Sequence, residues 1–281
     1  MWFLYSLTAV ASTTTLALLF RKVSTRSDDP RAFSFIFNLT ALFISISLVA
    51  VTGIGEINLD AQTAALLVAS GLGYGIFQRY QFLARKNIEA SIMQTIATPA
   101  GVIGYALAIV WLGEAVTLAK VLGYGLILLS ALIVINPKPS KLKLNKYFIL
   151  VVLIAGALSA AATIDRRVSP NFSSALTYAS VLWAFQVVAV LLPTISISNI
   201  KKEIKLHKNM IPLLASVNVV ALFCTVSALQ LAPVSSVSPV LASNVVFIAL
   251  FGIIILRERQ RTMCKLSAAV ITFLGLFLVS R

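Results

Sequence analysis

The chain has 281 residues, of which 59% are hydrophobic and only 11% are charged, and its formal net charge at pH 7 is +14. Soluble domains carry about 25% charged residues, so this composition excludes an ordinary soluble protein and indicates an integral membrane protein. The basic residues form short clusters between apolar runs instead of one amphipathic face, which argues against nucleic-acid binding. Two cysteines and one histidine are too few for a disulfide framework, a zinc site or a histidine-dependent triad, so we expect no metal and no cofactor.

Ten apolar segments follow one another along the chain, and each is close to the roughly 20 residues that cross a hydrocarbon core of about 30 Å. In chain order they are residues 2–20, 33–54, 63–82, 88–112, 116–135, 147–163, 172–193, 211–230, 234–256 and 263–280. The sequence therefore predicts an all-α membrane protein with ten transmembrane helices and little chain left for a soluble domain.

The chain divides at "NPKPSKLKLNK", residues 136–146, which contains two prolines and four lysines. Five spans lie on either side, which gives a first repeat over 1–136, a basic linker over 137–146 and a second repeat over 147–281. "RKVS" at 21–24 returns as "RRVS" 145 positions later, and a shift of 144 carries Glu114 onto Glu258, so we predict an internal duplication. Because five is an odd number, the second repeat must enter the membrane from the opposite side, as an inverted-topology pair.

The basic residues predict the orientation of the chain. Nineteen of the 23 Lys and Arg residues fall in or beside the connections that follow the first, third, fifth, seventh and ninth spans. The positive-inside rule places these connections in the cytoplasm and both termini outside the inner membrane. Arg166 and Arg167 lie on the opposite side, beside Asp165, either as an outer-gate ion pair or as a relic of the duplication.

Two stretches share a further pattern: "ASIMQTIATPAGVIGYALAIVWLGEAVTLAKVLGYGLILLSALIVI" at 90–135 and "VSSVSPVLASNVVFIALFGIIILRERQRTMCKLSAAVITFLGLFLVS" at 234–280. Each has a helix with an early proline, "GE" or "RE" at its end, and a closing helix rich in Gly and Leu. Pro99, Glu114 and Glu258 carry the pattern, whereas Pro239 falls four residues earlier in its repeat than Pro99. The chain resembles the EamA type of the drug/metabolite transporter superfamily. The resemblance implies ten helices that carry small metabolites, with efflux slightly favoured, and a central cavity among the third, fourth, eighth and ninth spans.

Polar residues inside the spans are the candidate substrate contacts, because such groups are costly in the bilayer. The candidates for the cavity are Asn38, Tyr74, Gln78, Arg79, Gln94, Thr98, Trp183, Gln186, Asn218, Ser238 and Asn244. Taken singly, each can equally serve as an interhelical hydrogen bond. Two roles are open to Arg79. Its guanidinium can bind an anionic substrate group through two hydrogen bonds, or it can snorkel to lipid headgroups.

No carboxylate lies at the middle of a span, where a proton-driven transporter usually keeps one. Asp165 comes nearest to a buried site, but the adjacent arginines are expected to hold it ionised, so the sequence does not indicate a proton-coupled antiporter. Glu114 and Glu258 sit at span ends and are expected to have structural roles at helix N-termini. Glycines in the third span form small-residue faces, Gly71 with Gly75 and Ala69 with Gly73, which predict close helix contacts.

We therefore predict a transporter that moves a small organic metabolite, an amino acid or a similar solute, by alternating access. One alternative is an exchanger of nucleotide sugars or phosphorylated metabolites. A second is a membrane subunit that handles lipids or acts as a scaffold without transport of its own. An enzyme is not expected, since the spans contain no nucleophile and base pair. The expected partners are the substrate and the lipid bilayer.

Overall fold

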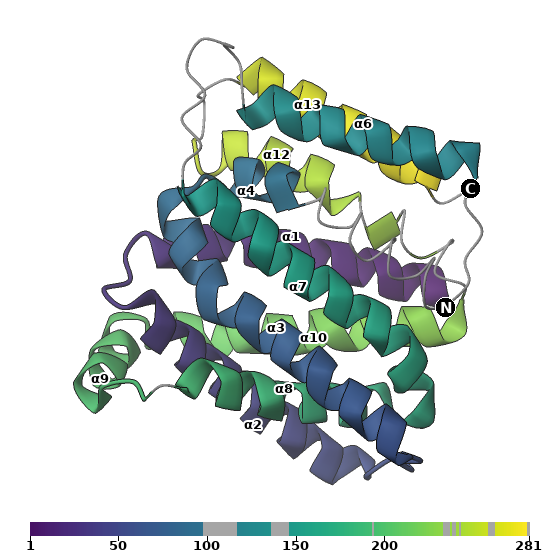
Figure 1. Ribbon diagram of the computed structural model, residues 1–281. Helices are drawn as coiled ribbons and strands as arrows, with labels where there is room; N and C mark the ends of the chain where they lie inside the picture. The colour runs from purple at the N-terminus through teal and green to yellow at the C-terminus, as the bar shows by residue number, and fades with distance from the viewer. Residues whose placement is uncertain are drawn as a thin grey trace.

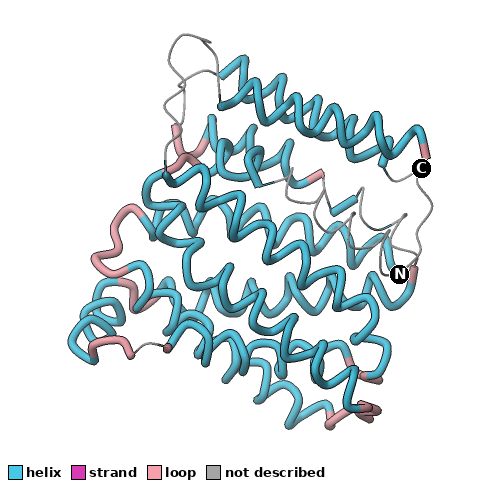
Figure 2. Tube along the Cα trace, viewed as in Figure 1, coloured by secondary structure: helices cyan, strands magenta, loops and turns pink. Residues whose placement is uncertain are grey.

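The computed structural model describes residues 1–97, 117–135, 146–192, 194–232, 237, 240–241, 243–257 and 262–279. The protein is a bundle of α-helices (Figures 1 and 2). In the described ranges the only β-type pairing is an isolated bridge between Ile57 and Phe172. The prediction of an all-helical membrane protein is thus confirmed at the level of fold class.

The helices follow the predicted spans closely. In the first half they are α1 (Trp2–Ser24), α2 (Pro30–Thr52), α3 (Ala61–Asn87), α4 (Ala90–Ala97) and α6 (Leu118–Ile135). In the second half they are α7 (Lys146–Val168), the 3-10 turn η3 (Ser169–Asn171), α8 (Ala175–Leu191), α9 (Ile197–Leu206), α10 (Met210–Leu231), α12 (Asn244–Ile254) and α13 (Thr262–Val279). Within the described residues, four helices are long and apolar enough to cross a membrane: Trp2–Ser24, Pro30–Thr52, Lys146–Asp165 and Met210–Ala228.

Short polar side chains begin several of these helices. Asp29 accepts hydrogen bonds from the backbone N–H of Arg31 and Ala32 at 3.0 and 3.1 Å and starts α2. Asp60 accepts from the N–H of Thr63 at 2.7 Å and starts α3. Such caps satisfy backbone donors that have no partner inside the helix.

The two ends of the bundle differ in character. Both chain termini lie at one end, which we call the terminal end, and α9 lies at the other, which we call the basic end (Figure 1). At the basic end, Arg21 donates to the carbonyl of Arg85, and the Nζ of Lys86 donates to the carbonyl of Ser27 at 2.7 Å. The folded chain thus brings together basic residues that the sequence analysis had assigned to one side of the membrane.

Helix contacts occur in matching pairs between the two halves. α3 packs against α7 and α8, and α10 packs against α1 and α2; α4 contacts α7, and α12 contacts α1. Two helix boundaries repeat as well, because α1 and α7 end at residues 24 and 168, while α2 and α8 begin at 30 and 175. The same pairs of contacts and boundaries thus recur in the two halves, and the predicted inverted repeat stays a prediction.

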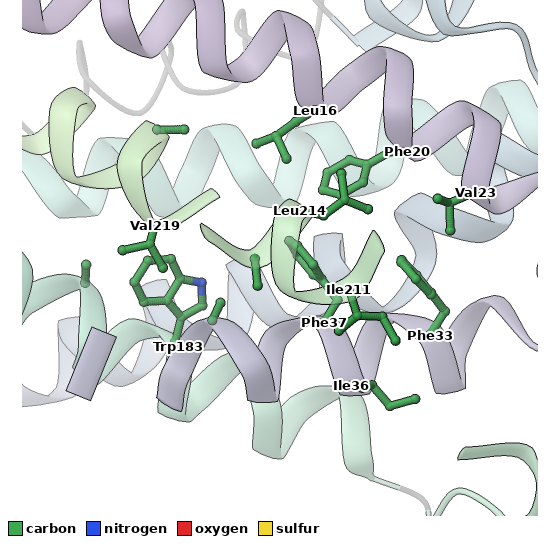
Figure 3. Packing of buried hydrophobic residues seen from close by; sticks show 14 of the residues in the cluster. Leu16, Phe20, Val23, Phe33, Ile36, Phe37, Trp183, Ile211, Leu214 and Val219 are labelled. Atoms are coloured by element: carbon green, nitrogen blue, oxygen red, sulfur yellow. The ribbon is translucent and has the colours of Figure 1, made fainter. Parts of the chain in front are cut away.

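An aromatic core fills the space between α1, α2, α8 and α10 near the basic end (Figure 3). Phe33, Phe37, Phe82 and Trp183 are at most 1% exposed. The rings of Phe20 and Phe82, and those of Phe33 and Phe82, meet edge to face with centroids 4.9 Å apart, which is a favoured aromatic geometry. This core joins helices of both halves into one packed body.

The glycines of α3 allow α7 and α8 to approach closely, as the small-residue faces predicted. A Cβ added at Gly71 would lie 2.5 Å from the Cβ of Phe185, and one at Gly75 would overlap the Cβ of Ala189. A Cβ at Gly73 would lie 3.0 Å from the carbonyl of Ala157 on α7. The two faces of α3 therefore contact two different helices of the second half.

Candidate functional site

The carboxylate of Asp165 is held by three hydroxyl groups near the terminal end of the bundle. Ser70 and Tyr178 both donate to its Oδ1, and the hydroxyl of Tyr74 donates to its Oδ2 at 2.7 Å. Ser70 and Tyr178 are fully buried. The carboxylate thus ties together α7, α3 and α8, and we call these four residues the Asp165 cluster.

Helical geometry explains how this cluster forms. Ser70 and Tyr74 are four residues apart and therefore lie on the same face of α3. Tyr178 lies in the first turn of α8, which begins where the hydroxyl of Ser174 accepts from the N–H of Thr177 at 3.3 Å. The ring of Tyr178 packs against Phe172, with centroids 5.1 Å apart. Both the position and the direction of these hydroxyls are thus fixed by secondary structure.

A second polar group lies between α2, α3 and α8. The hydroxyl of Ser34 donates to the carbonyl of Gln78 at 2.6 Å, and Nδ2 of Asn38 donates to the carbonyl of Ser34 at 2.8 Å. Gln186 is 2% exposed on α8. The side-chain oxygens of Asn38 and Gln186 have no hydrogen-bond partner within the described part of the chain. Buried amide oxygens without partners are costly, which makes these two atoms available to a ligand or a water.

Arg79 lies on α3 and points toward the end of α8. Its Nη1 donates to the carbonyl of Ala189 at 3.3 Å, and its guanidinium lies 5.5 Å from the ring centroid of Tyr80. This contact ties α3 to α8, in addition to the contacts that the glycines allow.

The other sequence candidates are dispersed. Trp183 lies in the aromatic core and Asn218 is half-buried on α10. Asn244 points toward α1, where its Nδ2 lies 3.5 Å from the hydroxyl of Thr13. The side chain of Gln94 and all of Thr98, Pro99, Glu114, Ser238 and Glu258 lie outside the described residues. The assignment of the candidates to a substrate cavity stays a prediction.

An apolar cavity of about 500 Å³ opens between α1 and α12. It is lined by Leu7, Val10, Ala11, Thr14, Thr15, Leu18, Leu19, Phe247, Phe251 and Ile255. The polar contact between Asn244 and Thr13 involves the same two helices. This cavity suits an apolar group and supplies little hydrogen bonding.

Paired connections close the terminal end. The N–H of Asn58 donates to the carbonyl of Asn171 at 3.0 Å, and the N–H of Ser173 donates to the carbonyl of Glu56 at 3.1 Å. The N–H of Gly55 donates to the hydroxyl of Thr177 at 3.2 Å. A Cβ at Gly55 would lie 2.6 Å from the Cβ of Ser174, so the two connections touch. We call this pairing of 53–60 with 169–177 the terminal closure.

A different clip closes the basic end. Oε1 of Glu203 on α9 accepts the backbone N–H groups of Asp28 and Asp29, both at 2.8 Å. Nδ2 of Asn199 donates to Oδ2 of Asp29 at 2.8 Å. These bonds fix α9 to the connection between α1 and α2, and we call them the basic-end clip.

We expect the change Glu203→Ala to loosen the basic-end clip, because it leaves two backbone donors without their acceptor. The cost is about 1–3 kcal/mol of unfolding free energy. Glu203→Gln retains an acceptor oxygen and is the matched control, with a smaller loss expected. Thermal unfolding of the purified protein in detergent measures both. An alanine variant as stable as the glutamine variant would contradict this role of Glu203.

His207 follows α9 and predicts a pH dependence of stability. Burial lowers the pKa of the imidazole below its usual value of about 6.5, and this outweighs the opposing effect of Glu203, whose Oε2 lies 3.6 Å from Nε2. The unfolded chain then binds a proton that the folded chain does not, so stability is lost as the pH falls below about 6.5. We expect melting temperatures of the His207→Gln variant to fall less over this range than those of the unsubstituted protein. Equal pH slopes would contradict this.

The comparisons with known proteins bear on the fold and the family. A sequence model described as the EamA-like transporter family matches residues 146–281, the second predicted repeat. No curated protein matches the chain. A crystal structure whose description names no function matches with a TM-score of 0.60 at 15% identity, over 99% of this chain and 97% of its own. At that identity the structural likeness shows the fold alone, and it extends over both halves.

Proposed function

We propose that this chain, whose residues 146–281 match the EamA-like transporter family, moves a small organic metabolite across the inner membrane by alternating access. The family match supports a membrane transporter of the drug/metabolite type. The finer proposal is that the substrate is an amino acid or a similar amphipathic solute, and that export is its direction.

The paired arrangement of the two halves is the observation that carries alternating access. The connection between α2 and α3 bonds to the one between α7 and α8, and the connection between α8 and α10 bonds to the one between α1 and α2. If each helix of one half is exchanged for its equivalent in the other half, the first of these bonded pairs of connections becomes the second, and the second becomes the first. An inverted repeat in which equivalent elements close each end can open one end at a time and present the same cavity to either side. This arrangement supports the inverted repeat that the sequence predicts.

The uncharged polar groups of α2 and α8 support a polar but neutral or zwitterionic substrate. The partnerless amide oxygens of Asn38 and Gln186 can accept from an ammonium or amide group. The cavity between α1 and α12 can receive an apolar side chain. A solute with one polar and one apolar part matches both.

A thermal-shift screen of the purified protein against a metabolite library tests the substrate class, since a ligand stabilises the folded state by mass action. Amino acids among the stabilising compounds, followed by counterflow of the same compounds in proteoliposomes, would support the proposal. Stabilisation confined to phosphorylated metabolites would favour the exchanger instead. Binding without counterflow of any compound would contradict transport.

The orientation has its own test. We propose that the basic end faces the cytoplasm, because nineteen of the 23 Lys and Arg residues belong to that side. A phosphatase reporter fused after Arg281 is expected to be active outside the cell membrane. A cytoplasmic reporter fused at the same site that proves active instead would overturn this orientation.

A further inference from the structure

The Asp165 cluster contains a hydrogen-bond arrangement that the ionised carboxylate satisfies best. An ionised carboxylate accepts hydrogen bonds and donates none, so it can serve all three hydroxyls. Ser70 and Tyr178 donate to Oδ1, and Tyr74 donates to Oδ2. A proton on Oδ1 displaces one of the two bonds that this atom accepts, and a proton on Oδ2 adds a buried donor beside the bond from Tyr74. In either case the carboxyl group loses its charge, and hydrogen bonds to a neutral acceptor are about half as strong as those to an ionised one. Protonation therefore weakens the bonds that join α7 to α3 and α8.

Ser70 also donates to the carbonyl of Ala161 at 3.3 Å, whereas the surroundings of Tyr178 are apolar. Tyr178 lies in an apolar cluster with Leu67, Val168, Phe172 and Leu182. In such surroundings a hydroxyl that has lost its acceptor carries a penalty that water would otherwise relieve. The helices can relieve this penalty by moving apart and admitting water.

The cluster is directly connected to the terminal closure. Tyr178 follows Thr177, whose hydroxyl accepts from the N–H of Gly55. The ring of Tyr178 contacts Phe172, which forms the β-bridge with Ile57. A movement of the first turn of α8 away from Asp165 therefore displaces two of the contacts that hold residues 53–60.

We propose that Asp165 is a proton-binding site that controls the terminal closure: the ionised carboxylate holds α3 and α8 against α7, and a proton from the water at the terminal end releases them. The role of this proton site rests on the proposed function: in a transporter, the site would link transport to a proton gradient.

Among the described side chains that face it, Asp165 is the one carboxyl group of this cluster. Tyr74 faces it from α3 and Tyr178 from α8, whereas the described residues of α4 and η3 bring no titratable side chain. On α7 itself, Arg167 lies two positions further along, and its charge acts on Asp60 in the next connection. The side chain of Arg166 lies outside the described set. The two roles predicted for these arginines, as an outer-gate ion pair or as a relic of the duplication, stay predictions.

The corresponding place at the basic end has no carboxyl group. The residues 145 positions before Asp165 and Tyr178 are Phe20 and Phe33, and the residue 144 positions after Ser70 is Leu214. These three belong to the aromatic core (Figure 3), whereas the residue 144 positions after Tyr74 is the polar Asn218. The proposed proton-binding carboxyl group is therefore present in one half only.

Hydrogen exchange measured by mass spectrometry on the full chain in nanodiscs, without substrate, tests the proposal. Exchange rates are divided by the intrinsic rates at about pH 8 and about pH 5.5, for peptides that cover the terminal closure. In the unsubstituted protein we expect these amides to exchange about tenfold faster at the lower pH, the effect of losing one hydrogen bond. Asp165→Asn, which carries one acceptor and one donor like the protonated acid, is expected to exchange fast at both pH values.

Glu56→Gln is the matched control, since it removes an exposed carboxylate from the same closure and should keep the pH step. Tyr74→Phe is the second variant, usable if Asp165→Asn does not fold, and should raise exchange at pH 8. Infrared difference spectra between the two pH values should show a protonated carboxyl band that Asp165→Asn lacks.

Three results would overturn the proposal. The first is an exchange rate in the unsubstituted protein that does not change with pH, and the second is an undiminished change of this rate with pH in Asp165→Asn. The third is an equal increase in exchange when Na⁺ replaces choline at constant pH. None of these depends on substrate, so their outcome is independent of the transport assay.

Discussion

Replacing Trp183 with alanine is expected to lower the free energy of unfolding by about 3 kcal/mol or more, even with no ligand present. The indole is 1% exposed and lies in the aromatic core, beside Val219 of α10 (Figure 3). Inside a membrane the gain from leaving water is absent, but the cavity left by the indole still loses its packing contacts. Unfolding of the purified protein in mixed detergent with SDS measures this.

Two variants make the result specific. Trp183→Phe keeps most of the packed volume and should cost less than half as much. Trp2→Ala removes an indole from the half-buried start of α1 and should change stability little. If Trp183 instead lined an open substrate cavity, the alanine variant would fold with normal stability and lose only substrate binding.

The span pattern predicted the helices well because it depends on length and apolar content, which the bilayer dictates. Residue 146 was placed at the end of the linker and begins α7. α9 was not predicted as a helix. Its apolar Ile197, Ile200 and Ile204 recur at helical spacing among lysines, but a search for apolar runs of about 20 residues passes over a ten-residue amphipathic helix.

The Asp165 cluster shows why part of the site escaped sequence reasoning. The sequence analysis considered only the adjacent arginines as partners of Asp165, because they are its neighbours along the chain. The actual donors come from residues 70, 74 and 178, which only the packing of α3 and α8 on α7 brings near. The spacing of Ser70 and Tyr74 indicated a polar face on α3. Nothing in the local sequence indicated that this face would contact Asp165.

Gly75→Ala is expected to destabilise the protein by about 1–3 kcal/mol, although the same change inside a helix normally stabilises by about 0.5–1 kcal/mol. The new Cβ would overlap the Cβ of Ala189 on α8, so α3 and α8 would have to separate. Gly125→Ala on α6 is the matched control, because nothing lies within 4 Å of the added Cβ. The same substitution should thus have opposite signs at the two positions, as measured by unfolding in detergent.

The double variant Gly75→Ala with Ala189→Gly separates the close contact from a general intolerance of α3. It removes the overlapping Cβ from α8 and should recover most of the stability that Gly75→Ala loses, apart from the cost of a glycine in α8. A double variant whose loss of unfolding free energy equals the sum of the losses of the two single variants would show that α3 and α8 are not held at this distance. Because Arg79 also bonds to the carbonyl of Ala189, a separation of these helices should weaken that contact too, and a transporter that works through α3 and α8 should lose activity together with stability.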